Sequence, residues 1–500
     1  MKKIIHLSLA ICMGLCCACS VTRDSFDPNR KYPPEQLRTD YQIFRHILEE
    51  SHPGLYWYAS KESLDQYFDR GYSAIQDSMT ETQFRILLSY VIARIDCGHT
   101  AVRYSKRYTH YLDTARLKQF PLVVKLWGDT MVVAANINPL DSVVKKGMVI
   151  KSIEGHSVQE LRDSLFNYQV TDGYSLTGKF QSLSTGFSFG GWYKNIYGLP
   201  DQMKMRYLDS AGQERETKLA VYDPRADTLV DAHSAFRKGM DRVRQRRQWD
   251  LFGSRNLQVD TAGSTAFMTI NTFSNGNHLK SFFRKGFRLL DEKKIRNLII
   301  DVRSNGGGDA TNSTRLTRYI IDKKFKLADS LYALHRRSRY GKYIEKDFFY
   351  GVLLTFLTHK GLDGKYHFGY FERHYFHPIR NHHYQGRVYV LVGGNSFSAT
   401  SLFAGCLKGQ KNVTLVGEET GGGYYGNSAW VIPDVTLPNT GIRFRLPKFR
   451  LVVDRHRLKD GRGVMPDVQA LPSTEAIRRG IDFKAEKVRE LIQAGADPNQ

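Results

Sequence analysis

Residues 388–401 read VYVLVGGNSFSATS: an apolar run, two glycines, and three serines within six residues. The helix-like segment 402–407 follows directly. A buried strand that turns into a helix here places a serine hydroxyl at a helix N-terminus, where free backbone amides and the helix dipole favour negative charge. The stretch therefore predicts an α/β fold with a hydroxyl positioned to attack a carbonyl carbon.

The composition is that of a globular protein. The chain has 500 residues, of which 41% are hydrophobic and 12% aromatic, so two or three domains are expected. A formal net charge of +23 fits an anionic partner or a solvated basic surface. No nucleic-acid-binding motif accompanies this charge, so no nucleic-acid partner is expected. Cys97 and Cys406 follow the N-terminal segment without metal-site spacing, which predicts two small buried residues and no metal or other cofactor.

Residues 1–18 have the features of a bacterial lipoprotein signal peptide. Two lysines precede an apolar run over residues 4–15, which is too short to cross a membrane comfortably. The lipid is expected on Cys19, with Cys17 as a second candidate because Cys16 holds the position that usually carries leucine. An ordinary cleaved signal is the alternative. The expected location is the cell envelope, where an exported protein is lipid-anchored on the periplasmic or outer-membrane side.

The remaining chain divides into five segments. They are a tether (19–34), an N-terminal helical region (35–117), a β-rich domain (118–225), an α/β catalytic domain (250–475) and a C-terminal helix or tail (476–500). A G-x-x-I-x-x-I-x-G pattern at 147–155 resembles a PDZ-like module, which binds an extended peptide as an added strand. An unrelated small β domain is the alternative. Residues 330–385 form an aromatic, basic insertion, expected to be a lid or cap, and 237–250 a basic linker or helix.

Two other segments supply possible partners for the serine turn. An apolar strand at 298–302 leads into Gly306–Gly308, which present backbone amides free of side chains. A helix begins near Thr80, where Thr80 and Gln83 form a capping-box pattern, and it ends in a turn that contains His99. His99 is thus a candidate general base, although a lone histidine at such a turn is more often structural.

Five motifs, taken in order, resemble the tail-specific (C-terminal processing) serine peptidase family. They read DCGHT (96–100), IIDVRSNGGG (299–308), SFSATS (396–401), VGEETG (416–421) and GVMPD (463–467). The resemblance covers roughly residues 35–470. It implies a crotonase-like sheet-and-helix peptidase core of the α/β class, flanked by an N-terminal helical region and the PDZ-like β-rich domain.

The resemblance also implies residue roles. The family's nucleophile falls on Ser398, and the oxyanion hole on the amide of Ala399 with that of Gly306 or Gly307. The best-known branch uses a lysine base, but residues 421–424 read GGGY and supply none. The tricorn-like branch uses a histidine, which His99 matches.

The branch's orienting acid falls on Asp460, where glutamate is more usual, and Glu419 is the reserve candidate. The implied function is an exported serine endopeptidase that cleaves unfolded or C-terminal protein segments through an acyl-enzyme. Its partners would be protein or peptide substrates and, through the lipid, the membrane. A non-catalytic lipoprotein that binds an apolar ligand or peptide is the alternative. An α/β-hydrolase esterase is disfavoured, because Gly394–Ser398 lacks the second glycine of a nucleophile elbow.

Overall fold

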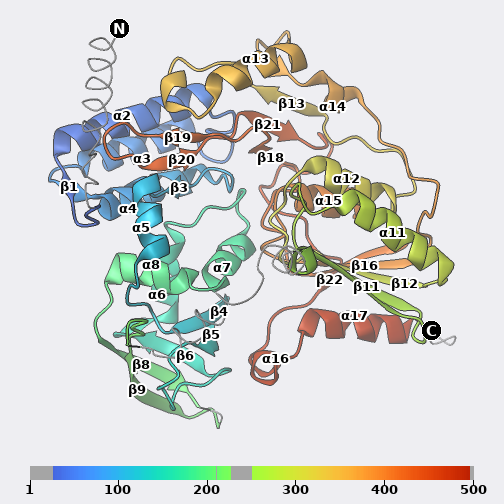
Figure 1. Cartoon of the computed structure of the whole chain (residues 1–500), viewed down its shortest axis with the longest axis horizontal. Coiled ribbons are helices and arrows are strands. Elements are labelled where there is room, and N and C mark those ends of the chain that lie inside the picture. Colours follow the sequence, from blue (N-terminus) through green and yellow to red (C-terminus); the bar gives the residue numbers. More distant parts are fainter. Residues whose placement is uncertain (1–25, 210, 227–250, 496–500) are drawn as a thin grey trace, which may run out of the picture.

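The computed structural model describes residues 26–209, 211–226 and 251–495. The predicted signal peptide, Cys19 as the expected site of the lipid, the start of the tether and the basic segment 237–250 lie outside these residues, as does the end of the tail. Figure 1 shows the N-terminal helices and the β-rich domain on one side of the molecule, and the catalytic half with the C-terminal helix on the other.

A six-stranded sheet forms the centre of the catalytic half, in the order β10-β11-β12-β16-β17-β22. Its strands are β10 (Arg255–Asp260), β11 (Thr265–Ile270), β12 (Asn297–Asp301), β16 (Arg387–Val392), β17 (Val413–Gly417) and β22 (Val468–Gln469). β10 is antiparallel to β11, and the other neighbours are parallel. β12 and β16 read as continuous apolar runs because parallel strands are covered on both faces. The predicted α/β core is confirmed.

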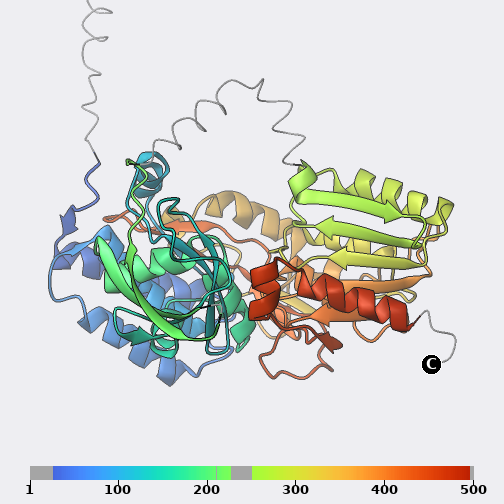
Figure 2. The same cartoon turned by 90° about the horizontal axis from the view of Figure 1, so that it is seen from below.

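Helices cover both faces of this sheet. α11 (Leu279–Glu292), α12 (Ala310–Arg318) and α15 (Ala399–Leu407) share one core with Ile300 and Val390. α17 (Phe483–Ala494) packs on the opposite face with Ile299 and Leu391. Successive strand residues point to opposite faces, so adjacent isoleucines serve different layers. Figure 2 shows α17 running along the side of the sheet away from these helices.

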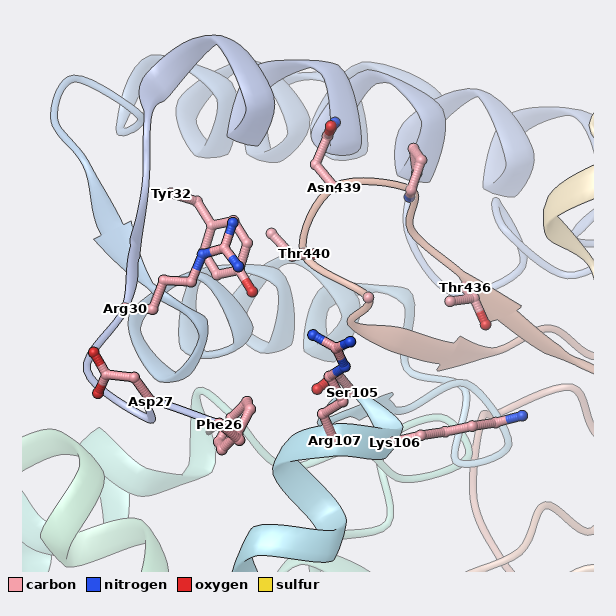
Figure 3. Close-up of a pocket in the computed structure, with 12 residues that line it drawn as sticks. Phe26, Asp27, Arg30, Tyr32, Ser105, Lys106, Arg107, Thr436, Asn439 and Thr440 are labelled. Atoms are coloured by element: carbon pink, nitrogen blue, oxygen red, sulfur yellow. The ribbon is translucent and has the colours of Figure 1, made fainter. Parts of the chain in front are cut away.

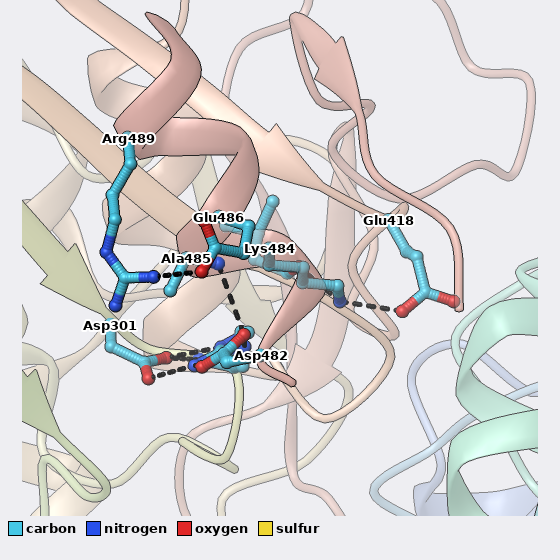
Figure 4. A network of polar contacts seen from close by, with 9 residues as sticks. Asp301, Glu418, Asp482, Lys484, Ala485, Glu486 and Arg489 are labelled. Atoms are coloured by element: carbon cyan, nitrogen blue, oxygen red, sulfur yellow. Dashed lines mark hydrogen bonds and ion pairs between the residues drawn. The ribbon is translucent and has the colours of Figure 1, made fainter. Parts of the chain in front are cut away.

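Ion pairs fasten α17, which follows α16 (Thr474–Arg479), to the sheet. Lys484 Nζ lies 2.6 Å from Glu418 Oε2 and 3.0 Å from the carbonyl oxygen of Val392 (Figure 4). Arg303 bridges a carboxylate of β12 to Asp482, which caps α17. Val392 is the last residue before the serine-bearing turn, so this network also holds the base of that turn.

The N-terminal region consists mainly of helices. They are α2 (Pro34–Ser51), α3 (Lys61–Ser73), α4 (Glu81–Ile92) and α5 (Lys106–Thr114), with the strand pair β1 (Lys31–Tyr32) and β2 (Met79–Thr80). The predicted capping box between Thr80 and Gln83 is confirmed. A hairpin of β19 (Asp434–Thr436) and β20 (Arg443–Arg445) pairs with β3 (Val102–Arg103). Val435 and Phe444 join the helical core, so this region shares one core with part of 250–475.

The segment 118–225 forms an antiparallel sheet with its own core. Its strands are β4 (Leu122–Trp127), β5 (Thr130–Asn136), β6 (Val149–Ile153), β7 (His156–Ser157), β8 (Gln202–Leu208) and β9 (Glu214–Ala220). Its helices are α6 (Val158–Phe166), α7 (Leu176–Ser184) and α8 (Ser188–Tyr197). The sheet therefore occupies the region that the sequence assigns to a β-rich domain.

The insertion 330–385 builds much of a second antiparallel sheet, ordered β14-β15-β13-β21-β18. Its elements are β13 (Ser330–Ala333), α13 (Asp347–Leu357), β14 (His359–Lys360), β15 (Tyr366–His367) and α14 (Gly369–Arg373), with β18 (Gly426–Ala429) and β21 (Phe449–Val452) from outside the insertion. α13 exposes Phe348, Phe349 and Phe356. Among the helices within the described ranges, none is both long enough and apolar enough to cross a bilayer.

Candidate active site

Ser398 stands at the junction of β16 and α15, where the sequence predicts a reactive hydroxyl. Its backbone has φ 58° and ψ −122°, a conformation that only glycine adopts without strain. Such strain costs on the order of 1–3 kcal/mol and clusters at functional sites. The residue is half-buried and lines a cavity of about 780 Å³. The helix N-terminus thus holds the Ser398 side chain at the wall of a cavity large enough for a peptide segment.

The lining of this cavity is largely apolar and comes partly from the insertion. α13 contributes Tyr350 and Leu353, and α14 contributes Phe371. Trp430 and Ile432 extend the apolar wall on the other side of the cavity. The prediction that the insertion forms a lid or cap beside the serine is therefore confirmed in its placement.

Gly307 lies against the nucleophile candidate and has no room for a side chain. A Cβ on Gly307 would stand 2.7 Å from Ser398 Cβ and 3.1 Å from the Ala399 amide nitrogen, and its φ is 102°. The Gly307 amide, however, donates to Asn305 Oδ1 at 2.9 Å. Gly306 is exposed, whereas Gly308 lines the cavity together with Ser398. The glycine tract lies where the resemblance implies it, but the Gly307 donor already has an acceptor.

The other two serines of the turn have structural partners. Ser396 is buried, and its hydroxyl donates to the Val302 carbonyl at 2.9 Å. Ser401 donates to the Ser396 carbonyl at 3.0 Å. These bonds tie the turn to β12 and leave Ser398 as the serine of the three that lines the cavity.

His99 is brought to the same turn, although it does not form a hydrogen bond with the Ser398 hydroxyl. Its ring lies 4.5 Å, centroid to centroid, from the ring of Phe397, the residue before the nucleophile candidate. The residue is only 3% exposed, and neither ring nitrogen has a hydrogen-bond partner among the described residues. The fold therefore places the predicted base beside the predicted nucleophile without joining the two by a hydrogen bond.

The carboxylate next to His99 belongs to Asp172, which the sequence analysis missed. Asp172 Oδ1 lies 3.8 Å from His99 Nδ1, too far for a hydrogen bond, and accepts the Gly98 amide at 2.9 Å. Its other oxygen accepts the Gly423 amide at 3.4 Å. No motif marks Asp172, because it follows α6 and meets the His99 turn only through tertiary packing.

The two acids chosen from the sequence have other hydrogen-bond partners in this structure. Asp460 is exposed, and its carboxylate accepts the Arg462 amide at 2.9 Å. Glu419 is buried, pairs with Arg462 at 2.6 Å and accepts the Gly463 amide at 2.7 Å. Within the described ranges, neither carboxylate lies within 4.0 Å of a His99 nitrogen, because local hydrogen bonds hold both in the loop that precedes β22.

Glycines occupy residues 421–423, in the turn where the best-known branch of the family carries its lysine base. A Cβ on Gly422 would stand 2.9 Å from the Ser398 amide nitrogen, and one on Gly421 would collide with the Gly394 carbonyl oxygen. The tract thus packs directly behind the serine turn, and side chains at these positions would displace it.

A second cavity, of about 560 Å³, lies in the N-terminal region (Figure 3). Arg30, Lys106 and Arg107 line it together with Tyr32 and the loop around Asn439. It contains none of the predicted catalytic or oxyanion residues, so it is separate from the candidate active site.

Comparison with solved structures shows the same fold in a known protein. Mature CPAF complexed with lactacystin matches with a TM-score of 0.63 and 14% identity, over 93% of this chain and 98% of that chain. Mature CPAF alone matches with a TM-score of 0.63 and 15% identity, over 92% and 96% of the two chains. At these identities the likeness establishes the fold. No curated protein sequence matches the chain.

Comparison with protein families shows which family the segment around Ser398 resembles. Residues 264–470 match peptidase family S41, and this segment includes every strand of the six-stranded sheet except β10, together with the glycine tract and Ser398. Through this segment the chain is similar to the serine peptidases of family S41.

Proposed function

We propose that this chain is an exported, lipid-anchored serine endopeptidase in which Ser398 is the nucleophile and His99 the general base. The observation that carries the proposal is the backbone of Ser398, strained at the N-terminus of α15 beside an apolar cavity. Ser396 and Ser401 have structural hydrogen bonds, which supports the choice of Ser398.

In the proposed reaction, His99 takes the hydroxyl proton while Ser398 Oγ bonds to the substrate carbonyl carbon. The carbonyl electrons move to oxygen, and the Ala399 amide donates a hydrogen bond to that oxyanion. The amide of Gly308, which lines the cavity, is the proposed second donor, because the Gly307 amide is already bound to Asn305. Each such donor is worth about 3 kcal/mol of transition-state stabilisation. The amine leaves with the proton from His99, and water then hydrolyses the acyl-enzyme by the same route.

The contact between Ser398 and His99 has to form during this cycle. In the ligand-free chain the His99 ring stacks on Phe397 and its nitrogens have no partner among the described residues. Catalytic hydrogen bonds are often long before substrate binds and shorten in the complex. We infer that a bound peptide shifts the half-buried Phe397 ring, which frees the imidazole to turn toward Ser398.

Two carboxylates are candidates for orienting His99. Asp172 has proximity in its favour, since it is the acid within ion-pair distance of the ring among the described residues. Asp460 has the family resemblance in its favour, and its loop contacts the Asp172 segment, because Tyr174 donates to the Gly461 carbonyl at 2.8 Å. Asp172→Asn is expected to lower kcat and change its pH profile, whereas Asp460→Asn is expected to leave both near wild type. The reverse result assigns the role to Asp460.

The substrate proposal is an unfolded or C-terminal segment of a protein, held by the β-rich domain as a PDZ-like grip. The pattern at 147–155 and the antiparallel sheet of 122–220 support it, since such sheets bind an extended peptide as an added strand. The measurement is cleavage of one unfolded protein with either a free or an amidated C-terminus. Equal cleavage of the two forms contradicts recognition of the terminal carboxylate.

Lipid attachment at Cys19 and the cell-envelope location are tested together. Cys19→Ser is expected to move the full-length protein from the membrane fraction to the soluble fraction and to abolish incorporation of labelled fatty acid. Cys17→Ser is the matched control. Unchanged membrane association of Cys19→Ser refutes an anchor at this residue.

The decisive test of the function is labelling of the folded full-length chain with a fluorophosphonate. Ser398→Ala and His99→Ala are expected to abolish labelling and peptide hydrolysis. Ser304→Ala, an exposed serine near the glycine tract, should leave both intact. Labelling that survives in Ser398→Ala contradicts the nucleophile assignment. A folded wild type that neither labels nor cleaves unfolded protein favours a non-catalytic binding lipoprotein.

A further inference from the structure

Three buried side chains with metal-binding atoms converge beside the candidate active site. Cys97 Sγ, a ring nitrogen of His99 and a carboxylate oxygen of Asp172 all lie within 4.8 Å of one another. The three residues are 3%, 3% and 1% exposed, respectively. Thiolate, imidazole and carboxylate together form a donor set that suits Zn²⁺.

The metal-binding atoms of His99 and Cys97 have weak or no hydrogen bonds among the described residues. Neither nitrogen of His99 has a hydrogen-bond partner among the described residues. Cys97 Sγ lies 3.8 Å from the Ser428 carbonyl oxygen, which is a long and weak hydrogen bond. An imidazole buried without a partner costs about 1–3 kcal/mol in lost hydrogen bonding. A bound cation would give one of these nitrogens and the Cys97 sulfur a partner.

The spacing also suits ligands of one ion better than it suits a hydrogen bond. His99 Nδ1 and Asp172 Oδ1 are 3.8 Å apart. Two ligands of a tetrahedral zinc ion stand roughly 3.4 Å apart, given bond lengths of about 2.0–2.2 Å. Only small movements are needed, because Cys97 and His99 lie in one turn whose Gly98 amide already donates to Asp172.

We propose that Cys97, His99 and Asp172 form a zinc site that inhibits the peptidase. The Cys97 thiol loses its proton to solvent as sulfur bonds to the ion, and His99 and Asp172 each supply a lone pair. A neutral imidazole that binds the metal through Nδ1 carries its hydrogen on Nε2, so Nε2 has no lone pair to accept the serine proton. The inhibition rests on His99 being the general base, whereas the zinc site itself does not.

Access to the site is controlled by one aromatic ring. Phe397 is half-buried and covers His99, and a Cβ on Gly98 would stand 2.6 Å from the Phe397 ring. The movement of Phe397 that substrate is proposed to cause would also open the cluster to the ion. Zinc and substrate should therefore compete.

The test titrates metal-free, full-length protein with Zn²⁺ and with Co²⁺, a spectroscopic substitute for zinc. We expect one equivalent whose thiolate-to-cobalt absorption disappears in Cys97→Ser, together with inhibition of hydrolysis that a chelator reverses. Cys97→Ser should keep its activity and need at least about tenfold more zinc for half-inhibition. Cys406→Ser is the matched control, since it removes the other cysteine of the described residues.

Each outcome is decisive. Equal zinc sensitivity of wild type and Cys97→Ser, or an absorption band that survives this substitution, overturns the site. A band that depends on Cys97 in a protein without hydrolytic activity keeps the zinc site and instead rejects the proposed function. If Cys97→Ser does not fold, Cys97→Ala takes its place in the same titration.

Discussion

Gly307→Ala should disable the peptidase through a contact that can be measured in the structure. The new Cβ would stand 2.7 Å from Ser398 Cβ and 2.9 Å from the Phe397 carbonyl oxygen. The carbon–carbon distance is roughly 1 Å shorter than an ordinary contact, so the nucleophile must move by a comparable amount. A misplacement of about 1 Å costs about 100-fold in rate, or about 2.7 kcal/mol of transition-state stabilisation. The φ of 102° adds on the order of 1–3 kcal/mol of strain to the folded state.

Gly306→Ala provides the matched control for this prediction. A Cβ at Gly306 meets no atom within 4 Å, and its φ lies outside the left-handed region, so this variant should label and unfold like the wild type. The assay is the rate of fluorophosphonate labelling, alongside denaturant unfolding of both variants. A folded Gly307→Ala protein that labels at the wild-type rate would refute the placement of Gly307 against the nucleophile.

Three other substitutions test the surroundings of the site. Burial raises the pKa of Asp96 to about 6. This value lies above the pKa of about 3.9 in the unfolded chain, so the free energy of unfolding should decrease as the pH rises from about 4 to about 6. Asp96→Asn should remove this decrease and stabilise the protein at pH 7 by at most about 3 kcal/mol. Denaturant unfolding at several pH values measures both effects. Lys484→Met leaves the partly buried Glu418 carboxylate unpaired and should cost up to about 3–5 kcal/mol of unfolding free energy, whereas Lys487→Ala, in an exposed pair, should cost under about 1 kcal/mol. Ser396→Ala should lose about 1–3 kcal/mol of stability but keep fluorophosphonate labelling, and a loss of labelling in a folded protein would contradict its structural role.

The parts of the site that the sequence predicts correctly are those encoded locally. An apolar run, a glycine pair and small residues specify the β16–α15 junction, so the position of Ser398 follows from neighbouring residues alone. The capping box of α4 is local in the same sense. The hairpin that carries Val435 completes the core of the N-terminal helices. No local sequence pattern indicates this contact, so the predicted N-terminal region, residues 35–117, does not include the hairpin.

The acid that lies beside His99 could not be predicted, because its position depends on packing between distant segments. The spacing of Asp460 from Gly463 matches a motif, but a motif does not fix where a carboxylate points. In the structure the Arg462 amide holds the Asp460 carboxylate within its own loop. Asp172 reaches His99 because the chain after α6 packs against the turn after α4, which periodicity cannot indicate.

Asp172 therefore connects the two halves of the site. One carboxylate oxygen accepts an amide from the turn that carries His99, and the other accepts the Gly423 amide from the tract packed behind Ser398. A carboxylate shared in this way links the turn of the proposed base to the tract behind the proposed nucleophile. An asparagine can retain one of the two accepted bonds but not the negative charge. Asp172→Asn should consequently cost more activation free energy, calculated from the loss of kcat, than free energy of unfolding. If Asp172 has only a structural role, the substitution should lower kcat and the free energy of unfolding together.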